Sequence, residues 1–159
     1  MPQVLTLIEP MSSVAVRPYG REKWSDSDYW AFCEANRKLH LECTSEGEIL
    51  ILPPTGAETA YRNTLAMADL ANWATEDGSG KSFGSGVQYF LPDGSGLSPD
   101  ASWVSNESLQ SLTKQERKKL LRLTPEFVVE VLPETDTLRE GRPKPRWNFG
   151  SPTESAWLG

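Results

Sequence analysis

The chain has 159 residues and a formal net charge of −6, with 38% hydrophobic and 24% charged residues. This composition is typical of one folded domain with a substantial core and excludes a disordered chain. The negative charge argues against a protein that coats nucleic acid, but not against an enzyme that holds a phosphate through a bound cation. No run of about 18 apolar residues could span a membrane, and the N-terminus lacks a signal or transit pattern, so we expect a cytoplasmic protein.

The first part of the chain predicts an irregular arm, a helix and a hairpin. Residues 1–24 are interrupted by prolines and have weak alternation, so we expect an irregular arm with one short strand in VLTLIE. A short helix should follow in WSDSDYWAFCEANRKL, with Ser25 or Ser27 as its cap. The segment KLHLECTSEGEILILPP alternates on both sides of a Ser-Glu-Gly turn, which predicts a β-hairpin.

The second part predicts helices and strands in alternation. A long helix should begin near Thr55 or Thr59 and end at Gly78, because apolar residues recur there at helical spacing. We expect two strands in residues 81–105, around the turn PDGSG, and then one or two short surface helices with a TKQE capping box. The segment FVVEVL predicts a buried strand. This order indicates an α/β fold with a mixed sheet flanked by helices, in which a further helix and strand would complete the sheet.

Two acidic residues interrupt strands that should be largely covered. Asp100 opens the strand DASWV directly after a proline, and Glu130 lies in the middle of FVVEVL. Two neighbouring carboxylates withdrawn from water repel each other, and a divalent cation such as Mg²⁺ or Mn²⁺ removes this cost. Glu58, in the first turn of the long helix, could face the same point. The structural alternative is that Asp100 is a turn residue and Glu130 points to solvent from an edge strand.

Two other polar residues lie in the predicted hairpin. His40 and Glu42 alternate onto one face, which we interpret as solvated. An exposed histidine there would leave no histidine near the acids to serve a catalytic triad.

Three segments in order resemble a known family. These are DYWAFCEANRKLHLECTSEGEILILPPTGAETAYRN, LPDGSGLSPDASWVS and TPEFVVEVLPETDTL, within about residues 25–140. Together they resemble the Uma-two (Uma2) family of restriction endonucleases, abundant in cyanobacteria, of the PD-(D/E)XK nuclease superfamily. The resemblance implies a restriction-endonuclease-like sheet in which Asp100 and Glu130 hold magnesium, with Glu58 as a third catalytic residue and DNA as the substrate. Glu42 matches a recurrent hairpin glutamate to which we assign no role.

The resemblance ends before the chain does. The short motif would have a lysine two residues after Glu130, but the sequence has Leu132, and the family's following lysine-bearing helix is not recognisable. A frameshift near Arg142 would explain this, because one permitted reading of the other frame is AKTKMEFWESNGVRLAW, which resembles that helix and the start of the last strand.

The consequences of this truncation are also predictions. We expect residues 25–136 to form an incomplete nuclease-like domain that lacks the last core helix and strand, and residues 137–159 to form an aberrant, disordered tail. The edge of FVVEVL should be unpaired and the fold marginally stable. Turnover should be weak or absent. The alternative is a non-catalytic interaction protein on a decayed nuclease scaffold. The oligomeric state is open, with a homodimer as one option.

Overall fold

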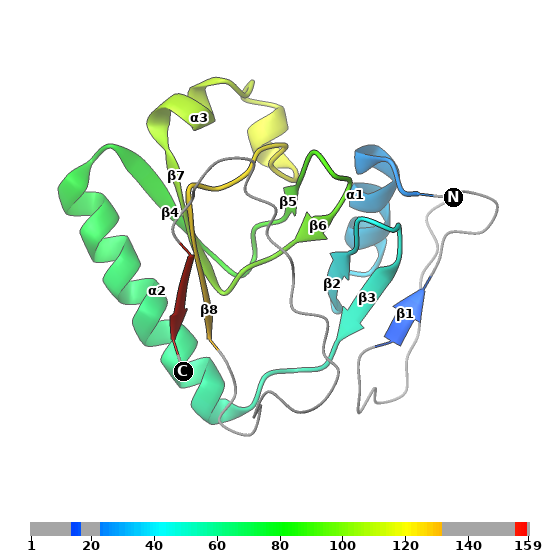
Figure 1. Ribbon diagram of the computed structural model, residues 1–159, viewed down its shortest axis with the longest axis horizontal. Coiled ribbons are helices and arrows are strands. Elements are labelled where there is room, and N and C mark those ends of the chain that lie inside the picture. Colours follow the sequence, from blue (N-terminus) through cyan, green and yellow to red (C-terminus); the bar gives the residue numbers. More distant parts are fainter. Residues whose placement is uncertain (1–13, 17–22, 132–154, 159) are drawn as a thin grey trace.

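Two sheets organise the molecule (Figure 1). A computed structural model describes residues 14–16, 23–131 and 155–158. The first sheet has the order β1 (Val14–Val16), β3 (Ile49–Leu52), β2 (His40–Cys43), β6 (Gly96–Leu97) and β5 (Tyr89–Phe90). The second has the order β4 (Gly80–Gly84), β7 (Ala101–Ser105), β8 (Phe127–Val131) and β9 (Ser155–Leu158). The second sheet is mixed, because β9 is parallel to β8 and the other pairs are antiparallel. The predicted α/β class is therefore confirmed.

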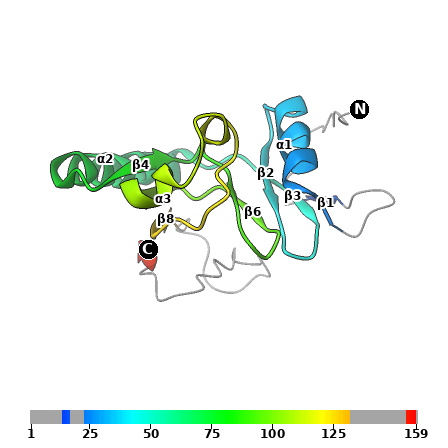
Figure 2. The same cartoon turned by 90° about the horizontal axis from the view of Figure 1, so that it is seen from above.

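The predicted helix and hairpin form at the first sheet. Helix α1 (Asp26–Ala35) has Ser25 as its N-cap, and the Ser25 hydroxyl accepts a hydrogen bond from the Asp28 amide at 3.1 Å. Strands β2 and β3 pair in the register that joins His40 to Leu52. Apolar side chains of α1 pack on the hairpin in one buried cluster: Tyr29, Phe32, Leu41, Cys43, Ile49, Ile51 and Leu120. Figure 2 shows α1 beside β2 and β3, at the opposite end of the molecule from the long helix.

Helix α2 (Ala57–Asp77) covers one face of the second sheet. It ends as predicted at Gly78, which adopts a left-handed conformation with φ of 71°. The predicted cap at Thr55 or Thr59 is wrong: the N-cap is Gly56, whose carbonyl accepts the first helical bond from the Ala60 amide at 2.9 Å. Thr59 lies inside the first turn and is buried. The helix is not apolar enough to cross a bilayer, and neither is any other helix in the described part of the chain.

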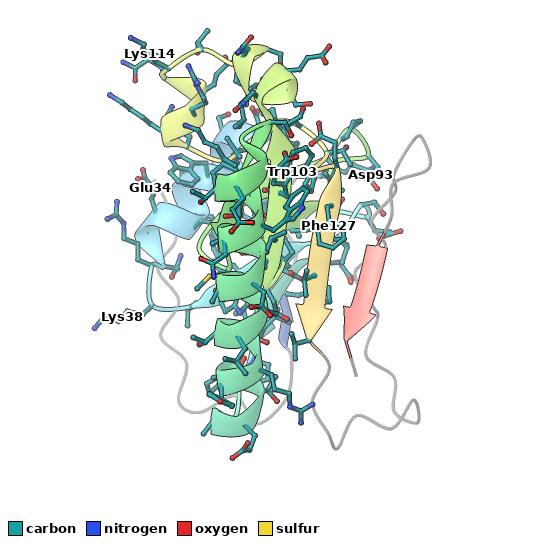
Figure 3. All side chains as sticks on the ribbon, turned by 90° about the vertical axis from the view of Figure 1, so that its left-hand side faces the viewer. Glu34, Lys38, Asp93, Trp103, Lys114 and Phe127 are labelled. Atoms are coloured by element: carbon teal, nitrogen blue, oxygen red, sulfur yellow. The ribbon has the colours of Figure 1, made fainter. Side chains whose placement is uncertain are left out.

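Aromatic and aliphatic side chains fill the contact between α2 and the sheet. Leu70 packs with Ala101, Val129 and Val131. Towards the other end of the helix, Trp103 and Phe127 lie side by side on neighbouring strands next to α2 (Figure 3).

The segment between α2 and β7 differs from the prediction. We expected two strands, but four form, because the chain leaves the second sheet after Gly84 and contributes β5 and β6 to the first sheet before it returns at Ala101. The turn between β5 and β6 has Gly94 at φ 88°, and the Asp93 carboxylate accepts a hydrogen bond from the Ser95 amide at 2.9 Å. This excursion joins the two sheets.

The next segment matches its prediction. Helix α3 (Asn106–Gln110) and a 3₁₀ turn (Glu116–Lys118) are the two short helices. The capping box forms reciprocally, since the Thr113 amide donates to the Glu116 carboxylate at 2.7 Å and the Glu116 amide donates to the Thr113 hydroxyl at 3.2 Å.

Strand β8 has partners on both sides. β7 pairs with it antiparallel, and β9 pairs with it in parallel from Val128 opposite Ser155 to Val131 opposite Leu158. The disorder predicted for residues 137–159 stays a prediction. The expectations of an unpaired edge and of a missing last strand are wrong, because β9 pairs with β8. The physical reason is that an exposed strand edge offers backbone donors and acceptors that any short extended segment can satisfy, with or without alternation. The predicted absence of the last core helix concerns residues 132–154, which lie outside the described residues, as does VLTLIE.

Gly96 should tolerate no side chain. It lies in β6 opposite Cys43, and a Cβ atom there would overlap the ring of Tyr29, which is fully buried. We expect Gly96→Ala to lower the free energy of unfolding by about 1–3 kcal/mol, because the packed core must shift to make room. Chemical denaturation would measure this. Gly86→Ala is the matched control, since nothing lies within 4 Å of its added Cβ, and equal losses in both variants would contradict the packing argument.

Candidate metal-binding site around Asp100

Asp100 lies at a bend directly before β7, at the end of the second sheet. One carboxylate oxygen, Oδ2, accepts a hydrogen bond from the Val131 amide at 2.7 Å. The other, Oδ1, accepts from the side-chain amide Nδ2 of Asn63 on α2 at 2.8 Å. The carboxylate therefore links α2 to the end of β8.

The pKa of Asp100 is raised above its ordinary value. The largest cause is desolvation by burial, which outweighs the lowering by the Val131 amide, by the electrostatic effect of His40 and by the Asn63 hydrogen bond. A raised pKa means that the ionised carboxylate costs the folded state free energy at neutral pH. A cation bound at Asp100 would offset that cost.

Glu130 is the neighbour of Asp100 across the sheet. Ala101 pairs with Val129, so continuing the antiparallel register by one residue places Asp100 opposite Glu130. Glu130 is half-buried. Val129 and Val131, on either side of it in the strand, pack against α2. The side chain of Glu130 therefore points away from α2, on the other face of the sheet. A cation shared by both carboxylates would have to lie at the end of the strands, where Asp100 bends away.

Glu58 occupies an exposed position in the first turn of α2. The α2 residue in contact with Asp100 is Asn63, which is more than one turn further along the helix. Among the described residues, no three His, Cys, Asp or Glu side chains come together as a metal-binding group. The site formed by Asp100, Glu130 and Glu58 thus stays a prediction. The side chains that the structure brings into contact are the Asp100 carboxylate and the Asn63 amide.

Asn63 is the residue that the sequence reasoning missed. Its side-chain oxygen Oδ1 is buried and has no hydrogen-bond partner within the described part of the chain. A buried acceptor without a donor is costly, so it points to a bound group. The available signal was its spacing: Asn63 is seven residues before Leu70, which places both on the face of α2 that meets the sheet.

The hairpin acid also differs from its prediction. We interpreted Glu42 as solvated, but it is buried, and its Oε1 accepts a hydrogen bond from the Ser98 amide at 3.2 Å. The reason is that the loop before Asp100 covers this face of β2. His40 is exposed as predicted. His40 lowers the pKa of Asp100 electrostatically, and the expectation that no histidine serves a catalytic triad at the acids stays a prediction.

The comparison with family models identifies the family. The model of the Uma2 family, described as "Putative restriction endonuclease", matches residues 26–147, which is more than half of the chain. The chain belongs to the Uma2 family. The Uma2 match includes the candidate residues Asn63, Asp100 and Glu130.

A solved structure is also similar to this Uma2 chain. It is described as "a putative nuclease belonging to DUF820 from Anabaena variabilis", and it aligns with a TM-score of 0.48 and 14% sequence identity. The alignment covers 58% of this chain and 50% of that chain, so it spans half the length of the Anabaena protein. No curated protein matches the chain.

Proposed function

We propose that this protein is an endonuclease that depends on a divalent metal ion and acts on DNA. Asp100 and Glu130 are its metal-binding carboxylates. The observation that carries the proposal is the environment of Asp100: a half-buried carboxylate with a raised pKa, next to an unpaired buried oxygen. Membership of the Uma2 family supports the nuclease activity. Glu58 remains a candidate third catalytic residue.

The donor set fits a hard divalent cation. Mg²⁺ and Mn²⁺ prefer oxygen ligands, and the groups around Asp100 offer carboxylate and amide oxygens. Each oxygen of Asp100 accepts one hydrogen bond and has a further lone pair for a cation. When bound, the cation would supply Lewis-acid activation of a phosphate oxygen and of water.

The protein's own groups have separable roles in this proposal. The Val131 amide and the Asn63 amide fix the orientation of the Asp100 carboxylate between two elements of the core. Glu130 supplies a second carboxylate from the neighbouring strand. Burial at the end of the sheet reduces competition from water, which strengthens electrostatic interactions at the site.

The proposal includes impaired turnover. The short motif has a lysine where this chain has Leu132, and the lysine-bearing helix that follows in the family is not recognisable in this reading frame. A cationic group stabilises the negative charge that develops on the phosphate. We therefore expect this chain to cleave plasmid DNA with Mg²⁺ about 100-fold more slowly than a version in which the reading frame is restored at Arg142. A gel-based nicking assay on both chains measures the ratio, and equal rates would contradict the truncation argument.

A non-catalytic interaction protein is the second candidate. The supporting observation is that α2 exposes large apolar side chains, which are typical of contact surfaces: Tyr61, Leu65, Met67 and Trp73. This reading predicts that Mg²⁺ and Mn²⁺ leave the melting temperature unchanged. The nuclease proposal predicts that they raise it.

A further inference from the structure

The two ends of the Asn63 amide are in different situations. Nδ2 donates to Asp100 Oδ1 at 2.8 Å, which fixes the orientation of the amide. With Nδ2 engaged there, Oδ1 is buried without a donor in the described residues. Rotating the amide by half a turn would bring two oxygens together, Asn63 Oδ1 and Asp100 Oδ1, so the observed orientation is electrostatically required.

A structural brace alone does not explain this arrangement. A side chain that only supported Asp100 would need one donor, and a serine or threonine hydroxyl would supply it without a second buried polar atom. A buried acceptor next to a carboxylate disfavours further negative charge but suits a cation or a water molecule bound to one. Through the Asp100 carboxylate, Asn63 is linked to the backbone amide of Val131 at the end of β8.

We infer that Asn63 is the metal ligand contributed by α2, with Oδ1 as an oxygen ligand to the divalent cation that Asp100 binds. Glu58 is then not part of the coordination sphere. This inference rests on the proposed metal dependence and deepens it, because it assigns the third oxygen to an amide and lowers the negative charge of the site. A site with fewer negative charges binds divalent cations more weakly. Loss of any one oxygen ligand should therefore lower the affinity for the cation measurably.

The test is a titration of the full chain with Mn²⁺, followed by thermal melting. We expect Mn²⁺ to raise the melting temperature of the unmodified chain and Asn63→Ala to weaken the apparent affinity for Mn²⁺ at least tenfold. Asp69→Asn, at an exposed acid on α2, should leave the affinity unchanged. Asn63→Asp is a second variant, needed because Asn63→Ala could lose Mn²⁺ affinity only through damage to the fold. Without metal it should melt lower, because two carboxylates face each other, and with Mn²⁺ it should show a larger rise than the unmodified chain.

The outcomes separate the two claims. If Mn²⁺ does not stabilise the unmodified chain, the metal dependence is wrong and the assignment of Asn63 falls with it. If Mn²⁺ stabilises the unmodified chain and Asn63→Ala retains full affinity, the nuclease proposal stands and the assignment of Asn63 is wrong. If Asn63→Asp melts lower both with and without Mn²⁺ and gains no larger rise, Asn63 is a structural brace and the inference is overturned.

Discussion

Asp100→Asn is expected to abolish the stabilisation of this chain by Mg²⁺ or Mn²⁺. A cation at 100 times its dissociation constant stabilises the native state by about 2.7 kcal/mol, and this increment should disappear with the carboxylate. Without metal the variant should be as stable as the unmodified chain or slightly more stable, because the substitution removes a charge whose ionised form is disfavoured by burial. The asparagine oxygen can still accept the hydrogen bond from the Val131 amide.

The measurement is thermal unfolding of the unmodified chain and of Asp100→Asn, with and without Mg²⁺ or Mn²⁺ at about 10 mM. Weak magnesium sites are occupied at concentrations on this order. Asp69→Asn is the matched control, since Asp69 is an exposed acid on α2. An equal metal-induced rise in Asp100→Asn and in the unmodified chain would show that the cation binds elsewhere. A large loss of stability in metal-free Asp100→Asn would instead indicate a purely structural carboxylate.

Removal of residues 155–159 is expected to destabilise the fold. These residues include β9, which pairs with β8 from Val128 to Val131. Their loss exposes the edge of a strand whose residues Val128, Val129 and Val131 are buried. The backbone hydrogen bonds of a four-residue pair contribute about 2 kcal/mol net of solvation and ordering. An exposed edge also invites association between molecules.

Two readouts test this prediction. Denaturant unfolding should show a midpoint shifted to lower concentration, and light scattering during heating should show earlier aggregation. A chain that lacks only the last residue is the control. If the shortened chain unfolds at the same denaturant concentration as the control and scatters no more light, β9 contributes nothing to stability.

Local signals explain which parts of the fold were predictable. Helix α1 follows from its serine cap and acidic first turn, and the hairpin follows from alternation around a glycine turn. The limits of α2 were predictable at Gly78, where a glycine ends the helix, but not at Gly56, where no side chain caps it. Strands β5 and β6 have two residues each, which is too short to show an alternating pattern, and β6 also pairs with the distant strand β2. The pairing of β9 depends on a distant strand edge and was equally hidden.

The candidate site divides in the same way. Asp100 was recognisable because a carboxylate follows a proline at the start of a covered strand, and its raised pKa fits that position. Asn63 was not, because an asparagine on the sheet-facing side of a helix has no distinctive pattern until the partner carboxylate is located. Glu42 was misinterpreted because alternation within the hairpin cannot reveal that the loop at Ser98 covers it. Contacts between elements that are distant in sequence therefore account for the missed parts of the site.

The central claim is that the carboxylate of Asp100 binds a divalent cation at the end of the second sheet. Anomalous diffraction from a crystal of the unmodified chain soaked in Mn²⁺ tests it most directly. The account predicts an anomalous peak within about 2.5 Å of an Asp100 carboxylate oxygen and of Asn63 Oδ1. A structure with Mn²⁺ at full occupancy elsewhere, and with no peak at Asp100, would contradict it.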